Sequence, residues 1–164
     1  MKKLKYLTIL TAIFLFVSCQ YDPYAIEYTT DEPVDADITG TYLFEKQTVD
    51  NKIKSFIDST NGSAVNPKIE IFEDGKYKAD NLPYFYSLVP VYSGLITGEG
   101  TWEKSVVGLV GNGTNKLDDH WGLILNGLPQ DLQNAGFMNK KPPFKIIFGF
   151  GDPDAGKVMI FKKQ

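Results

Sequence analysis

The side chains best suited to chemistry in this chain are one cysteine, Cys19, and one histidine, His120, which follows Asp118 and Asp119. Such a group could polarise an imidazole as a general base or supply ligands to a metal ion. A metal site needs three or four converging ligands, however, and neighbouring residues of a strand point to opposite faces. We therefore expect His120 to lie in a surface loop at the start of a strand and to bind no metal.

Two further stretches contain residues typical of ligand loops. Residues 152–156, DPDAG, begin like a calcium loop, but the closing glutamate and the flanking helices are missing. They predict a hairpin turn. Residues 108–113, GLVGNG, lack the lysine of a phosphate loop and predict a connection between elements. No nucleophile motif accompanies them. The sequence thus predicts a protein that is not an enzyme and needs no cofactor.

Composition limits the class of partner. The chain has 164 residues, 43% of them hydrophobic and 13% aromatic, which is ample for one packed domain. Its formal net charge is −3, and all of its basic residues are lysines. Arginine is the usual residue for bidentate recognition of phosphate, so its absence from an acidic chain argues against nucleic-acid binding.

The N-terminal residues 1–19 read MKKLKYLTILTAIFLFVSC and have the organisation of an export signal. Lys2, Lys3 and Lys5 form a positive start, and an uncharged run follows over residues 7–17. This run is much shorter than the roughly 20 apolar residues of a spanning helix, so no permanent transmembrane helix is expected.

The end of this signal resembles the lipobox of bacterial lipoproteins. Its residues are Phe16-Val17-Ser18-Cys19, with phenylalanine in place of the usual leucine. By this resemblance residues 1–18 are a lipoprotein signal peptide. Cys19 then becomes the mature N-terminus and is linked by a thioether to a lipid that carries acyl chains such as palmitate. Several acyl chains anchor a protein stably to a membrane.

Residues 19–37 contain six acidic residues, two prolines and no lysine. This composition predicts a flexible, extended tether between the lipid and the folded domain. The lysine-only, Tyr-rich and Asn-rich style resembles lipoproteins of Bacteroidota, and Asp58-Ser59-Thr60 resembles their O-glycosylation site. The resemblance implies the bacterial cell envelope, in particular the outer membrane, on either its periplasmic face or the cell surface.

Residues 38–164 show the signals of strands and turns. Alternating apolar residues or β-branched and aromatic clusters mark 41–49, 68–80, 97–104, 120–127 and 144–163, and only 128–136 has helical character. Short strands at this spacing, several with internal glycines, predict a mostly β fold. We expect a small antiparallel up-and-down β-barrel with one short helix, and the alternative is a β-sandwich.

Two short motifs resemble those of bacterial lipocalin-like lipoproteins. Gly40-Thr41-Tyr42 stands where the family's first strand carries Gly-x-Trp, with tyrosine in place of tryptophan, and Gly100-Thr101-Trp102 repeats the pattern in mid-chain. The resemblance covers residues 38–163 in pattern only. It implies a barrel that binds a small apolar ligand in its interior.

The stretch NLPYFYSLVPVYSGL, residues 81–95, is the most suggestive binding feature. Tyrosines offer a flat face for stacking and a hydroxyl group, which suits contacts with sugars, peptides or proteins. The alternative is a strand that packs its aromatic side chains into the core. The candidate ligand-binding residues are Tyr84, Phe85, Tyr86, Trp102 and Trp121.

Two functions therefore stay open for the domain. The first is a membrane-anchored barrel that binds a small apolar or amphipathic ligand. The second is an envelope interaction or structural protein that binds a protein or a glycan through an exposed aromatic segment.

Overall fold

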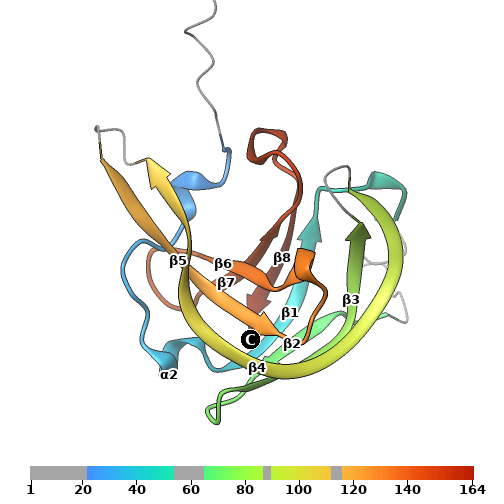
Figure 1. Cartoon of the computed structure of the whole chain (residues 1–164), viewed down its shortest axis with the longest axis horizontal. Helices are drawn as coiled ribbons and strands as arrows, with labels where there is room; N and C mark the ends of the chain where they lie inside the picture. The colour runs from blue at the N-terminus through green and yellow to red at the C-terminus, as the bar shows by residue number, and fades with distance from the viewer. Residues whose placement is uncertain (1–21, 54–64, 87–89, 112–115) are drawn as a thin grey trace, which may run out of the picture.

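The computed structural model describes residues 22–53, 65–86, 90–111 and 116–164. Within them the chain forms a closed barrel, in which consecutive strands are antiparallel neighbours and the first strand pairs with the last (Figure 1). The strands are β1 (Gly40–Gln47), β2 (Lys68–Ile71), β3 (Lys76–Tyr86), β4 (Val91–Gly111), β5 (Leu117–Asn126), β6 (Asn134–Met138), β7 (Lys145–Gly149) and β8 (Val158–Lys163). The predicted up-and-down barrel is confirmed, and closure of the sheet excludes the β-sandwich.

The interior of the barrel is packed with the protein's own side chains. In β2 Ile69 and Ile71 are 0% and 2% exposed, whereas Lys68 and Glu70, which alternate with them, are half-buried. Inward residues of this kind form one contiguous core with large aromatic members from five strands. The largest of them that are fully buried are Tyr42, Tyr77, Phe85, Phe137, Phe148 and Phe161. An eight-stranded barrel is just wide enough to be filled in this way.

The short helix α2 (Asp35–Ile38) closes one end of the barrel. Ile38 is completely buried, and the Tyr42 hydroxyl donates a hydrogen bond of 2.6 Å to its carbonyl oxygen. The Lys163 ammonium, at the end of β8, donates to the carbonyl oxygen of Asp37 at 2.7 Å. Tyr42 of the Gly40-Thr41-Tyr42 motif thus links the closing helix to β1. The closed eight-stranded antiparallel barrel is compatible with a lipocalin-like fold.

Strand β4 is long and strongly curved, and it pairs first with β3 and then with β5 (Figure 1). Gly100 lies where the two pairings meet, and a Cβ atom there would collide with the carbonyl oxygen of Asn126. The glycine therefore permits a close approach of backbones. Because β4 continues to Gly111, the connection expected over 108–113 is strand as far as residue 111.

The helix expected over residues 128–136 is absent. A single 3-10 turn, η4 (Gln130–Leu132), is followed at once by strand β6. The sequence after Leu132 pairs with β5 on one side and β7 on the other, which fixes it in an extended form. By contrast, the hairpin turn expected at 152–156 is present as η5 (Pro153–Ala155) between β7 and β8.

Residues 22–37, which we call the strap, lie on the barrel wall. The Thr29 amide donates to the carbonyl oxygen of Phe137 at 3.1 Å, and the Trp121 amide donates to that of Thr29 at 3.0 Å. At the other end of the strap the Lys104 ammonium lies 2.9 Å from the Glu32 carboxylate and 3.2 Å from that of Asp35. The described part of the predicted tether is therefore bound to the domain. Two of its acidic residues form ion pairs with Lys104 on β4, and two of its tyrosines pack on an apolar surface of the barrel wall.

That wall is the outer face of β6, β7 and β8. Met138, Ile147, Val158 and Ile160 form a second buried cluster there, and Tyr24 and Tyr28 of the strap pack against it. Residues 158–161 of β8 are consecutively buried for this reason, since the core covers one face and the strap covers the other.

Candidate functional site

The aromatic segment of the sequence forms one edge of the barrel, where β3 ends and β4 begins. Tyr84 and Tyr86 lie edge to face, with ring centroids 6.1 Å apart and an interplanar angle of 76°. Tyr86 is 62% exposed and Val91, its partner in β4, is 60% exposed. We call Tyr84, Tyr86, Val91 and Tyr92 the aromatic rim. It offers stacking faces and hydroxyl groups to solvent.

Buried aromatic rings support this rim from below. Phe85 is fully buried and contacts Tyr92 at 6.0 Å and Phe150, from the β7–β8 turn, at 5.1 Å between centroids. The Tyr84 hydroxyl lies 3.5 Å from a carboxylate oxygen of Asp131, in turn η4. Partial desolvation, followed by the charge of Asp131, raises the pKa of Tyr84, so its hydroxyl stays protonated and able to donate. The rim is thus held by turn η4 and, through Phe85, by the β7–β8 turn.

The two tryptophans lie elsewhere. Trp102 is on β4, close to the start of β3, and its indole N–H donates to the carbonyl oxygen of Phe72 at 2.8 Å. Trp121 is on β5 under the strap and is hydrogen-bonded through its backbone to Thr29. Both are partly buried against the core. Of the five candidate ligand-binding residues, the structure brings together Tyr84, Phe85 and Tyr86, and it places Trp102 and Trp121 apart from them.

A second site, which the sequence did not indicate, joins the strap to β5. The Tyr28 and His120 rings are stacked, with centroids 3.9 Å apart and planes 10° apart. The Tyr28 hydroxyl donates to a carboxylate oxygen of Asp22 at 2.7 Å. His120 is 8% exposed, and its Nε2 lies 3.1 Å from the Phe137 carbonyl oxygen. The expectation of a surface loop at His120 is wrong because the strap covers this residue.

Burial sets the protonation of both rings. Desolvation lowers the pKa of His120, although the Phe137 carbonyl and Asp22 oppose the shift, so the neutral imidazole is favoured. Desolvation and the hydrogen bond to Asp22 raise the pKa of Tyr28. The pair is a neutral stacked contact that holds the strap.

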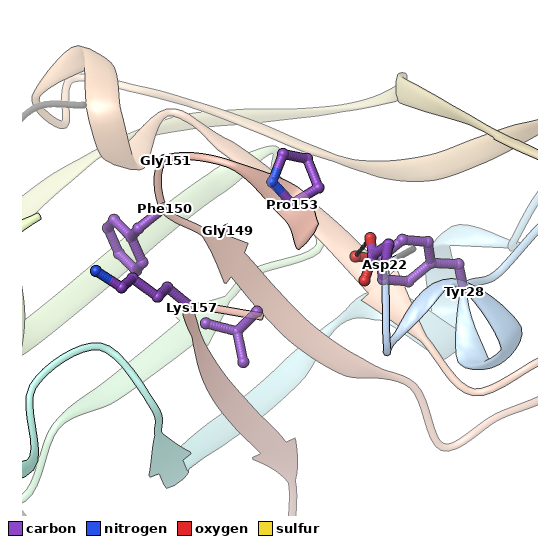
Figure 2. A pocket seen from close by; sticks show the side chains of 8 residues that line it. Asp22, Tyr28, Gly149, Phe150, Gly151, Pro153 and Lys157 are labelled. Carbon is purple, nitrogen blue, oxygen red and sulfur yellow. Dashed lines mark hydrogen bonds between the residues drawn. The ribbon is translucent and has the colours of Figure 1, made fainter. Parts of the chain in front are cut away.

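A small pocket lies between the strap and the β7–β8 turn (Figure 2). Figure 2 shows Asp22 and Tyr28 on one side and Phe150 and Lys157 on the other, with Pro153 between them. It encloses about 90 Å³. Typical small-molecule sites enclose about 300–1,000 Å³, so this pocket suits a few water molecules or a small ion rather than a metabolite. None of the five predicted residues lines it.

The expectations for lipid attachment, glycosylation, metal binding and membrane-spanning helices concern other parts of the chain. Cys19 and Asp58-Ser59-Thr60 lie outside the described residues. In the described part of the chain, His, Cys, Asp and Glu residues do not gather in groups of three or more that could bind a metal ion. Among the same residues, no helix has the length and apolar character needed to span a bilayer.

No protein-family model matches this chain, and no curated protein or solved structure matches it significantly. Function must therefore be argued from the barrel itself and from the chemistry of its surface.

Proposed function

We propose that this protein is a membrane-anchored lipoprotein of the bacterial cell envelope that binds a small apolar or amphipathic ligand without catalysing a reaction. The ligand lies at the aromatic rim of the barrel. The observation that carries this proposal is the edge-to-face contact between the ring of Tyr86, which is 62% exposed, and the ring of Tyr84, whose hydroxyl lies 3.5 Å from Asp131. An exposed ring that is held by a neighbouring ring is preorganised for stacking, because less side-chain entropy is lost when a ligand binds.

The rim suits a ligand better than the middle of the barrel does. The fully buried rings of Phe137, Phe148 and Phe161 already occupy the interior. A ligand placed there would have to displace close-packed side chains, which costs free energy. At the rim a ligand needs only to cover exposed apolar surface and to meet the hydroxyl groups of two tyrosines.

The anchoring rests on the N-terminal sequence. Lys2, Lys3 and Lys5, the short apolar run over 7–17 and the motif ending in Cys19 together support export and lipid attachment. An acidic domain is repelled by anionic membrane surfaces, so a covalent lipid is the more effective attachment.

A titration of the unlipidated mature chain with laurate tests the rim. Ring NMR signals of Tyr84 and Tyr86 would be followed. The indole signal of Trp102, on β4 near the start of β3 and away from the rim, is the internal control. We expect saturable shifts at the rim only. A matched pair of variants, Tyr86→Ala and Phe72→Ala, removes exposed aromatic rings at the two ends, and only the first should abolish the shifts. Shifts that are absent, or that persist in Tyr86→Ala, would contradict the proposal.

A second candidate function uses the same surface for a protein or glycan of the envelope. It is favoured by the exposure of both Tyr86 and Val91, which would leave much of a small ligand uncovered. Oligosaccharides in the same titration and crosslinking in intact cells distinguish the two. Rim shifts with oligosaccharides but not with laurate, or one recurrent crosslinked partner, would favour this second function.

A further inference from the structure

The strap restricts how far the barrel can stand from a membrane to which Cys19 is anchored. Asp22 is fixed by three hydrogen bonds within the strap, from the Tyr24 amide at 2.8 Å, the Tyr28 hydroxyl at 2.7 Å and the Ala25 amide at 3.2 Å. Consecutive Cα atoms are at most about 3.8 Å apart, so Cys19 lies within roughly 11 Å of Asp22. The lipid therefore emerges close to the barrel wall.

Further contacts fix the position of this exit on the barrel. The Asn139 amide donates to the Glu27 carbonyl oxygen at 2.8 Å, and a Cβ atom on Gly156 would approach Pro23 to 3.0 Å. Pro23 thus lies against the β7–β8 turn. Figure 1 shows the described chain beginning at the edge of the molecule that also carries this turn, the end of β4 and the start of β5.

The end of β4 and the start of β5 together expose an apolar pair. Leu109 and Leu117 are 62% and 64% exposed. Leu109 lies opposite Asp119, and Leu117 lies opposite Gly111, so the two leucines are diagonal neighbours on one face. On the other face of the hairpin Val110 and His120 are each 8% exposed. The leucines therefore point away from the packed side of the hairpin.

We propose that Leu109 and Leu117, near the end of β4 and at the start of β5, rest in the interfacial layer of the bilayer that holds the lipid of Cys19. This inference depends on the anchoring proposed above. The short distance from Cys19 to Asp22 brings this edge of the barrel to the membrane, and exposed leucines gain free energy when lipid covers them. The barrel is then held in one orientation instead of moving freely on a tether.

The charges near this edge indicate the kind of lipid. Asp119 is exposed on the same face as the two leucines, and Asp152 and Asp154 are exposed on the β7–β8 turn. Lys116, exposed beside Leu117, and the half-buried Lys157 offset only part of this negative charge. Carboxylates are repelled by anionic headgroups within a Debye length. The surface that fits is zwitterionic lipid.

The test uses the full-length lipidated chain in phosphatidylcholine vesicles. The thioether consumes the thiol of Cys19, the sole cysteine, so Leu117→Cys introduces one site for a nitroxide label. The control is Phe72→Cys, at an exposed apolar position in the β2–β3 turn, which Figure 1 shows at the opposite edge. We expect the label at 117 to lose access to a water-soluble nickel reagent and to gain access to oxygen, while the label at 72 stays in water.

Equal access of the nickel reagent to both positions, on chain that floats with the vesicles, would overturn the orientation and leave the anchoring intact. A chain that fails to float, with a Cys19 thiol that still reacts with maleimide, would overturn both proposals. Protection at 117 that persists in detergent and grows with protein concentration would assign the leucines to a second copy of the chain and would overturn the contact with lipid.

Discussion

The Tyr28 ring lies flat on the His120 ring at 3.9 Å between centroids, and this contact joins the segment before the barrel to strand β5. It makes the strap part of the folded unit. The acidic residues that follow Tyr28 extend the attachment, since Glu32 and Asp35 are both paired with Lys104. The segment from Asp22 onward therefore packs as part of the domain, and it covers a wall that would otherwise expose Ile147 and Ile160.

Replacement of Tyr28 separates the roles of its ring and its hydroxyl. Tyr28→Phe keeps the stack but loses the hydrogen bond to Asp22, which should lower the free energy of unfolding by about 1 kcal/mol. Tyr28→Ala also loses the stacked and buried ring and should cost about 3 kcal/mol. Urea denaturation followed by tryptophan fluorescence measures both. Equal costs for the two variants would mean that the ring does not contribute.

Acid should destabilise the domain through His120. Because burial lowers its pKa, the unfolded chain binds a proton more readily than the folded chain does. The stabilising contribution is complete above the unfolded pKa of about 6.5 and is lost progressively as the pH falls below that value. We expect the free energy of unfolding to decline between pH 7.5 and 5 more steeply in the wild type than in His120→Gln. Parallel curves for the two proteins would contradict this assignment.

A methyl group at Gly100 should be poorly tolerated. Its Cβ would collide with the Asn126 carbonyl oxygen and would approach the ring of Tyr77. We expect Gly100→Ala to cost about 3 kcal/mol, at the upper end of the cost of overpacking. Gly111→Ala is the control, because nothing lies within 4 Å of its Cβ position in the same strand. Thermal unfolding of both variants measures the difference, and similar melting temperatures would show that the backbones can separate.

Neighbouring residues of the rim should separate binding from folding. Phe85→Ala removes a fully buried ring and should cost about 3–5 kcal/mol of stability. Tyr86→Ala removes a mostly exposed ring and should change stability by less than about 0.5 kcal/mol. Chemical denaturation beside the laurate titration provides both readouts. A large loss of stability in Tyr86→Ala would show that the ring supports the fold instead of serving a ligand.

Replacement of Cys19 tests the anchor directly. Cys19→Ala should abolish incorporation of radiolabelled palmitate and should shift the protein from the membrane fraction to the soluble fraction. Ser18→Ala is the control, because it keeps a small residue before the cysteine and should be processed normally. A Cys19→Ala protein that still fractionates with membranes would contradict lipid attachment as the cause of membrane association.

Much of the barrel could be predicted from local patterns. The alternation in 68–80, with a turn at Asp74-Gly75, corresponds to β2 and β3, and the turn at 152–156 separates β7 from β8. The failure at 128–136 has a physical cause. A short segment with proline at its start and glycine at its end looks helical by itself, but β5 and β7 each offer it a row of hydrogen-bonding partners.

The candidate site also combines features that the local sequence predicts with features that only tertiary contacts decide. Tyr84, Phe85 and Tyr86 are adjacent in sequence, so their proximity needed no tertiary information. Which of them faces solvent did need it, because a shift in the β3–β4 register falls between Tyr84 and Phe85. The grouping of Trp102 and Trp121 with these residues rested on residue type alone. Trp102 lies in the part of β4 that pairs with β5, and Trp121 lies on β5 itself.

The sequence by itself determined the strand and turn periodicity, a mostly β fold that is either a barrel or a sandwich, and the aromatic character of one segment. Each of these depends on residues a few positions apart, whose preferences act locally. Only the tertiary structure decided that the acidic segment after Cys19 is a strap and that His120 is buried beneath Tyr28. Those contacts join distant parts of the chain, and they depend on the apolar wall that β6, β7 and β8 form together.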